Sequence, residues 1–316
     1  MLKAGRVEQA RACFSNALAL GPNIPPVVWR SANFDYDLGE HRRALSRTSW
    51  LLENAPIYDA PVFDLYDQRK TSITEILADG LGSKARPSRA YLRHLMEARD
   101  FDHAAMAWSR LISHRLAEDR VARDYVNFLY KDRRYETAAR AWALYLGGRA
   151  KGYLEATWLF NGDFEIEPSG SRFDWTMSNL NDDVEVALDA SVARTGARSL
   201  RIRFAGKENV NYKGVSQTAF VTPGVYRFQA FVRAQGITTD QGIGFHVFDA
   251  EDSRRLDVRT GQVIGTTEWT PIEQIVLVRP DTRLLTVEVV RQESLKFDSN
   301  ISGTAWLDDV SLTKVE

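Results

Sequence analysis

The chain has 316 residues, of which 44% are hydrophobic and 26% charged, and its formal net charge is −1. This is the composition of a soluble globular protein long enough for two domains, each with its own core. No basic stripe interleaved with aromatic residues points to nucleic acid, no apolar run approaches a membrane span, and the single cysteine, Cys13, excludes an intramolecular disulfide.

The first 147 residues contain a repeat of 34 positions. Residues that match at this offset include Gly5 and Gly39, Ala10 and Ala44, Pro22 and Pro56, Tyr91 and Tyr125, and Trp108 and Trp142. Small residues let two helices approach closely, and the tryptophans fill the space between layers. The period resembles the tetratricopeptide repeat, which implies an α-solenoid of helical hairpins over residues 1–147. Residues 79–87 are predicted to be a loop between helices.

Proteins with this repeat commonly bind peptides or partner proteins in a concave groove, so the resemblance implies a protein partner for residues 1–147. The alternative is that the helices only space or dock the second domain. Met1-Leu-Lys-Ala-Gly5 reads as the last turn of a helix whose remainder is missing. We therefore expect the natural protein to extend further at its N-terminus, where a targeting segment could lie.

Helical periodicity fades after Tyr145, and the glycines of Leu146-Gly-Gly148 favour a helix stop. Residues 148–157 are predicted to be a linker, beyond which the hydrophobic period changes from about 3.6 to 2. Strand-like segments bounded by turn signals then recur at 184–188, 199–204, 215–221, 225–234, 243–249, 269–278, 284–291 and 305–313. They predict a β-sandwich of the jelly-roll type over residues 158–316.

Six short motifs follow one another in this second half. They are Asn161-Gly-Asp-Phe-Glu165, Trp175, Thr195-Gly-Ala-Arg-Ser-Leu200, Thr222-Pro-Gly-Val-Tyr226, Thr267-Glu-Trp269 and Trp306-Leu-Asp-Asp-Val310. In this order they resemble the carbohydrate-binding modules of families 4, 9 and 22, which share a jelly roll. The resemblance implies a polysaccharide or oligosaccharide ligand, although the same fold also occurs as a domain that binds nothing.

The opening stretch 159–165 and the closing stretch 306–312 both combine strand-forming residues with carboxylates. If they lie side by side, their oxygens would suit a hard cation such as calcium; the alternative is that the acids are solvated turn residues. The resemblance implies a structural calcium with these ligands: the Gly162 carbonyl, the Glu165 side chain, the Arg198 carbonyl and the Asp308 carboxylate. Many family members have a further acid where this chain has Thr195.

Sugar recognition needs flat aromatic faces and planar polar side chains. Outward positions of the predicted strands and one polar loop supply the candidates Tyr212, Gln229, Phe231, His246, Phe248, Glu288 and Arg291. The alternative is that the two phenylalanines pack under a loop or against the helices, and that the histidine is an ordinary sheet residue. The long loop 291–303, in which Leu295, Phe297 and Ile301 alternate with polar residues, is expected to pack on the sandwich or the helices.

Motifs for catalysis are missing. Gly214-Val-Ser-Gln-Thr lacks the last glycine of a nucleophile elbow, and the five histidines lack metal-binding spacing. The sequence therefore predicts a non-enzymatic accessory protein that binds glycan through the sandwich and protein through the helices. The pairing resembles accessory proteins of bacterial cell-surface polysaccharide assembly, which implies a periplasmic or envelope location. The alternatives are a pure protein-interaction scaffold with a non-binding jelly roll and a polysaccharide-active hydrolase, since acidic residues are plentiful.

Overall fold

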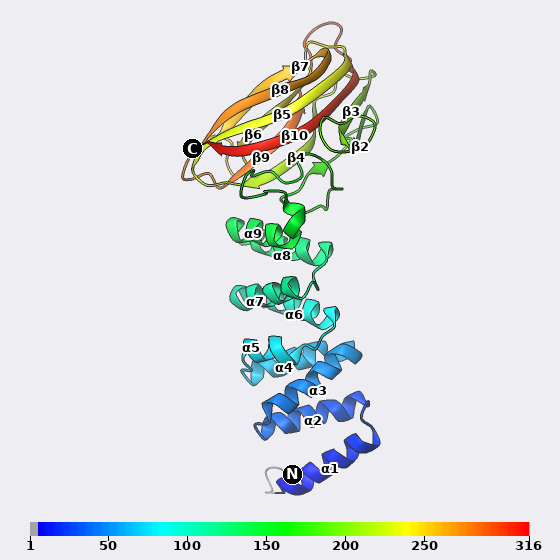
Figure 1. Ribbon diagram of the computed structural model, residues 1–316, viewed down its shortest axis with the longest axis vertical. Helices are drawn as coiled ribbons and strands as arrows, with labels where there is room; N and C mark the ends of the chain where they lie inside the picture. Colours follow the sequence, from blue (N-terminus) through cyan, green and yellow to red (C-terminus); the bar gives the residue numbers. More distant parts are fainter. Residues whose placement is uncertain (1–5, 316) are drawn as a thin grey trace. The chain divides into compact units, whose positions relative to one another are not determined.

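The computed structural model describes residues 6–315 of the chain (Figure 1). These residues form two compact units, which divide between Val121 and Ala122. The first unit is helical and the second carries two β-sheets, so the predicted fold class, helices followed by a β-sandwich, is confirmed. None of the described helices combines the length and apolarity that a membrane span requires.

The first unit consists of consecutive helices. They are α1 (Val7–Leu20), α2 (Pro25–Asp37), α3 (His41–Asn54), η2 (Pro56–Tyr58), α4 (Asp59–Gln68), α5 (Ile73–Glu75), η3 (Ile76–Gly80), α6 (Ala85–Glu97) and α7 (Phe101–Ser113). A residue with a left-handed backbone conformation follows the first helix of three successive pairs: Gly39 after α2, Lys70 after α4 and Arg99 after α6. The predicted loop 79–87 is shorter than expected, because α6 accommodates Pro87 in its first turn, where proline is tolerated.

A last helical pair belongs to the second unit. It comprises α8 (Asp119–Lys131), which enters this unit at Ala122, α9 (Tyr135–Leu146) and the short η4 (Gly147–Ala150). The buried Trp142 ring of α9 meets Phe160 of the sandwich edge-on, with ring centroids 5.9 Å apart. The predicted linker 148–157 is itself partly packed, since Tyr153 is only 3% exposed. That the chain folds as independent domains with the predicted limits stays a prediction.

One carboxylate ties this helical pair to the sandwich. Glu251 accepts hydrogen bonds from the Tyr135 hydroxyl, at 2.9 Å, and from the Arg133 guanidinium. Arg283 adds a second guanidinium 3.8 Å from the carboxylate. Burial favours the neutral acid, but these donors outweigh it and hold the pKa of Glu251 below its usual value. The carboxylate is therefore charged at neutral pH and joins α8–α9 to the loop that follows β6.

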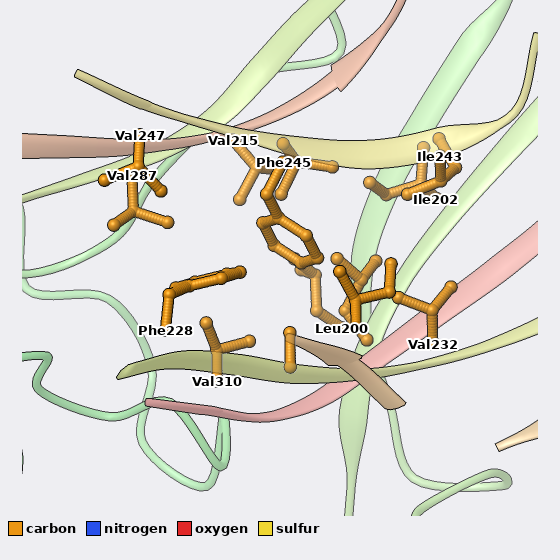
Figure 2. Close-up of a cluster of buried hydrophobic side chains, with 14 of the residues drawn as sticks. Leu200, Ile202, Val215, Phe228, Val232, Ile243, Phe245, Val247, Val287 and Val310 are labelled. Carbon is orange, nitrogen blue, oxygen red and sulfur yellow. The ribbon is translucent and has the colours of Figure 1, made fainter. Parts of the chain in front are cut away.

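The sandwich has two antiparallel sheets, here called sheet I, in the order β1-β4-β9-β6-β7, and sheet II, in the order β2-β3-β10-β5-β8. Their strands are β1 (Thr176–Met177), β2 (Val184–Asp189), β3 (Ser199–Ala205), β4 (Tyr212–Phe220), β5 (Gly224–Ile237), β6 (Ile243–Asp249), β7 (Asp257–Val263), β8 (Gly265–Val278), β9 (Leu284–Arg291) and β10 (Ser302–Val315). Alternate side chains from both sheets fill the core, where Phe228 of β5 meets Phe245 of β6 (Figure 2).

The opening stretch of the sandwich lies along its last strand. The Trp158 amide donates to the Leu312 carbonyl at 2.8 Å, and the Val310 amide donates to the Gly162 carbonyl at 2.9 Å. Gly162 is needed here, because a Cβ at this position would lie 1.8 Å from the Val310 carbonyl oxygen. The prediction that the two ends of the sandwich are neighbours is confirmed.

Candidate functional site

The loop Arg194–Arg198 gathers the predicted metal ligands around its backbone. Its first two amides, those of Arg194 and Thr195, donate to Asp308 at 2.8 and 3.1 Å. Further along the loop, the Ala197 and Arg198 amides donate to the Glu165 carboxylate at 2.8 and 3.1 Å. One short loop thus holds a carboxylate from each end of the sandwich.

These donors already occupy several of the oxygens that a cation would need. Asp308 accepts a third amide, that of Asp309, and the Gly162 carbonyl accepts the amide of Val310. The Arg198 guanidinium, a fixed positive charge, donates to the Glu165 carbonyl. Within residues 6–315, no three His, Cys, Asp or Glu side chains converge into a metal-binding group. As arranged, the residues do not fit calcium, because a cation would have to displace N–H donors and face a guanidinium.

The calcium prediction can be tested by melting the protein with and without a chelator. Because amides bind both oxygens of Asp308 and one of Glu165, we expect EDTA to change the melting temperature by less than about 1 °C, and added calcium to have no larger effect. Differential scanning fluorimetry on chelator-dialysed protein measures this, with magnesium as the control ion. A loss of several degrees in EDTA that only calcium restores would show that the ion displaces the amides.

The candidate sugar-binding residues do not form one surface. Gln229 and Phe231 lie on the outer face of sheet II, because β5 belongs to that sheet. His246, Phe248 and Glu288 lie on the outer face of sheet I, which contains β6 and β9. Alternation along each strand predicts whether a side chain points inward or outward, but it does not say which sheet the strand joins.

Tyr212 and Arg291 are buried inside the sandwich, and the prediction that they face a ligand is wrong. Tyr212 starts β4 rather than lying in a loop; its ring packs edge-on against Phe204, and its hydroxyl donates to the Ser178 carbonyl at 3.1 Å. Arg291 is 1% exposed, and its guanidinium donates to groups in three separate loops. Both side chains support the sandwich from inside.

The loop after β9 also differs from expectation. Ile301 is fully buried, as predicted for a packed loop. Leu295 and Phe297, by contrast, are entirely exposed at its tip, so they pack on neither the sandwich nor the helices of the second unit. Ser294 holds the loop just before this tip, since its hydroxyl donates a hydrogen bond to the Asp240 carboxylate at 2.6 Å.

Strand register builds two polar rows across the outer face of sheet I. The first row contains Ser216, Glu288, His246 and Arg259, from β4, β9, β6 and β7. The second contains Thr218, Thr286, Phe248 and Asp257 from the same strands. His246 links the rows: its Nε2 lies 2.9 Å from Asp257 Oδ1, and its ring stacks on Phe248 at 4.5 Å.

Glu288 is only weakly paired within these rows. Its side chain is 17% exposed, and the nearest ring nitrogen, His246 Nδ1, lies 3.8 Å from the carboxylate. Burial raises the pKa of Glu288 above its usual value, although Lys213, His246 and Arg259 act in the opposite direction. A carboxylate in this state has acceptor capacity to offer a hydroxyl-rich ligand.

A hollow of about 320 Å³ adjoins the first row, within the size range of small-ligand sites. Gly244 lets β6 and β7 approach closely beside it, since a Cβ at this position would lie 2.8 Å from the Gly261 carbonyl oxygen. Planar polar side chains surround it: Gln241, Arg259, Gln262 and Gln292. Sequence analysis missed these residues because Gln241 and Gln292 flank predicted strands, while Arg259 and Gln262 lie on β7, which was not predicted at all.

A second hollow, of about 380 Å³, lies on the outer face of sheet II and includes Gln229 and Phe231. The Phe231 ring is not free, because the Arg194 guanidinium lies over it at 3.5 Å and pairs with Asp309. The Gln229 amide donates to Glu273 of β8. Phe231 and Gln229 therefore already have partners within the protein.

Comparison with known proteins gives neither a matching family model nor a matching curated protein. Solved structures resemble the sandwich. A family 61 carbohydrate-binding module in complex with β-1,4-galactotriose is 19% identical, covers 50% of this chain and 99% of that chain, and gives a TM-score of 0.36. The CBM22-1 xylan-binding domain of Paenibacillus barcinonensis Xyn10C is 16% identical over 45% and 86%, with a TM-score of 0.31. Likeness at this level establishes neither a family nor a ligand for this chain.

Proposed function

We propose that this chain is a non-enzymatic protein that binds a polysaccharide or oligosaccharide on the outer face of sheet I. The observation that carries the proposal is the weakly paired Glu288 carboxylate, placed in register with Arg259 beside a hollow lined by amides. Carboxylate, guanidinium and amide groups are planar and bind pairs of neighbouring hydroxyls. Phe248 adds an apolar surface within the second row, between Thr286 and Asp257.

The arrangement favours binding over hydrolysis. A glycosidase places two carboxylates on either side of the bond that it cleaves. Here Asp257 and Glu288 lie on one sheet face in adjacent rows, and His246 stands between them with a hydrogen bond to Asp257. This arrangement suits a ligand that lies along the sheet. Hydrolysis is the alternative outcome of the same experiments.

The proposal predicts which face is needed. We expect Arg259→Ala and Glu288→Gln each to weaken binding to the retained polysaccharide by about tenfold or more, since each removes a planar polar contact. Phe231→Ala, on the opposite face, should leave the affinity unchanged. Affinity gel electrophoresis over a panel of neutral and acidic polysaccharides finds the ligand, and calorimetry measures the change.

Three results would contradict this proposal. Retention on no polysaccharide would remove glycan binding altogether, and loss of binding in Phe231→Ala alone would move the site to sheet II. Release of reducing sugar by the wild-type protein would favour the hydrolase.

The finer proposal is an accessory protein of bacterial cell-surface polysaccharide assembly that holds a protein partner through its helices. Its support is a hollow of about 450 Å³ in the first unit, lined by Phe14, Trp29 and Phe34 among others. The competing function is a pure interaction scaffold. A full-length protein that retains a defined partner, but no polysaccharide, would favour the scaffold.

A further inference from the structure

Sheet II ends in a long strand whose outer edge is open. Within the described residues, β8 forms a ladder only with β5 on one side, and its other side is the edge of the sheet. Pro271 and Pro280, which have no N–H to donate, bracket the stretch 272–279. An unpaired edge of this length is a template for another strand.

Natural sheet edges are usually protected by lysine, proline, inward charges, bulges or very short strands, and Pro271 protects only the beginning of this stretch. Here the outward side chains at the centre of the stretch are Ile275 and Leu277, which are 54% and 61% exposed. Register extends the apolar surface inward, because Leu277 lies beside Val225 of β5, which in turn lies beside Val315 of β10. Val225 and Val315 are also more than one-third exposed.

The stretch is complementary to itself when two copies run antiparallel. If Val276 of one copy faces Val276 of the other, Ile275 faces Leu277 of the second copy. In the same register Glu273 faces Arg279, so a charge pair closes each end of the apolar centre. Residues 273, 275, 277 and 279 are all exposed and alternate with buried or half-buried ones, so the whole set is on the outward face.

We propose that a second copy of this chain pairs with β8 in this register, giving a two-fold dimer with one sheet continuous across both copies. The interface is isologous, because the same stretch serves both copies. In the single chain, the Gln274 side-chain amide donates to the Ile275 carbonyl at 3.1 Å, a bond that a backbone N–H of the partner strand would replace. The glycan face of sheet I takes no part, so this proposal and the proposed function can fail separately.

The test is the mass of the full-length protein in solution. We expect sedimentation velocity at about 10–100 µM to give twice the 35.8 kDa chain mass, in line with a specific but modest interface. Glu273→Arg and Arg279→Glu should each give a monomer, because each places like charges opposite one another. The double variant Glu273→Arg with Arg279→Glu should restore the dimer, since the charge pair is then reversed.

Two further variants act as controls. Leu277→Glu removes the apolar centre and should also give a monomer. Leu180→Glu changes a side chain of similar exposure, 55%, away from β8 and should leave the dimer intact. All these positions are exposed, and an unchanged circular dichroism spectrum shows that each variant is folded. A wild-type monomer, or a dimer that survives the single charge reversals, would overturn the proposal.

Discussion

Replacing Arg291 by leucine is expected to lower the free energy of unfolding of the second unit by about 3–5 kcal/mol, because several buried acceptors lose their donor at once. The guanidinium, 1% exposed, donates to these groups: the Asn209 side chain and the carbonyls of Val210, Gln241 and Ser299, together with the Thr239 hydroxyl. These acceptors lie in the connections β3–β4, β5–β6 and β9–β10. One side chain therefore holds three loops at the same end of the sandwich.

Urea unfolding, followed in the transition of the β-sheet unit, measures this loss. Arg203→Leu is the matched control, since its side chain is 64% exposed and its nearest carboxylate, that of Glu185, is 3.8 Å away. The control should change stability by no more than about 0.5 kcal/mol. If Arg291→Leu cost less than about 1 kcal/mol, the loops would be held by other contacts.

Asp308→Ala is expected to cost about 3 kcal/mol, because it leaves three backbone amides without their acceptor and empties a fully buried position. The side chain is fully buried, and its carboxylate accepts from the amides of Arg194, Thr195 and Asp309. Asp308→Asn keeps an acceptor oxygen and should cost less. A loss below about 1 kcal/mol in the alanine variant would contradict the role given to this cluster.

The pH dependence of the same variants separates charge from hydrogen bonding. Burial raises the pKa of Asp308 above its value in the unfolded chain, although the amides act in the opposite direction. The folded protein thus binds the proton more tightly than the unfolded chain does. The stability of wild type relative to Asp308→Asn should be highest at acid pH and fall as pH rises through the folded pKa. A relative stability that rises with pH over this window would contradict the raised pKa.

The strands were predictable where alternation was strong. In β5 and β6 the inward residues, such as Phe228 and Phe245, repeat every second position, so both the strands and their inward faces could be read from the sequence. That the two ends of the sandwich are neighbours was also predictable, since the stretch 159–165 opens the domain and the stretch 306–312 closes it. These features depend on residues close together in the chain.

Features set by long-range pairing could not be read in this way. β5 and β6 follow one another in the chain yet join opposite sheets, so their outward residues were wrongly placed on one surface. β7 carries Arg259, Thr260 and Gly261 in its middle, which weakens its hydrophobic signal although it lines the candidate site. Arg291 looked like a surface residue, because its acceptors come from loops distant in sequence.

The attachment of α8–α9 to the sandwich bears on how the chain can be divided for experiment. A fragment that started at residue 148 would lack the Tyr135 hydroxyl and the Arg133 guanidinium that bind Glu251. It would also expose Phe160 where Trp142 now covers it. A fragment that starts ahead of Asp119 would keep these contacts. The sensible cut for producing the β-rich part alone is therefore in the loop before α8.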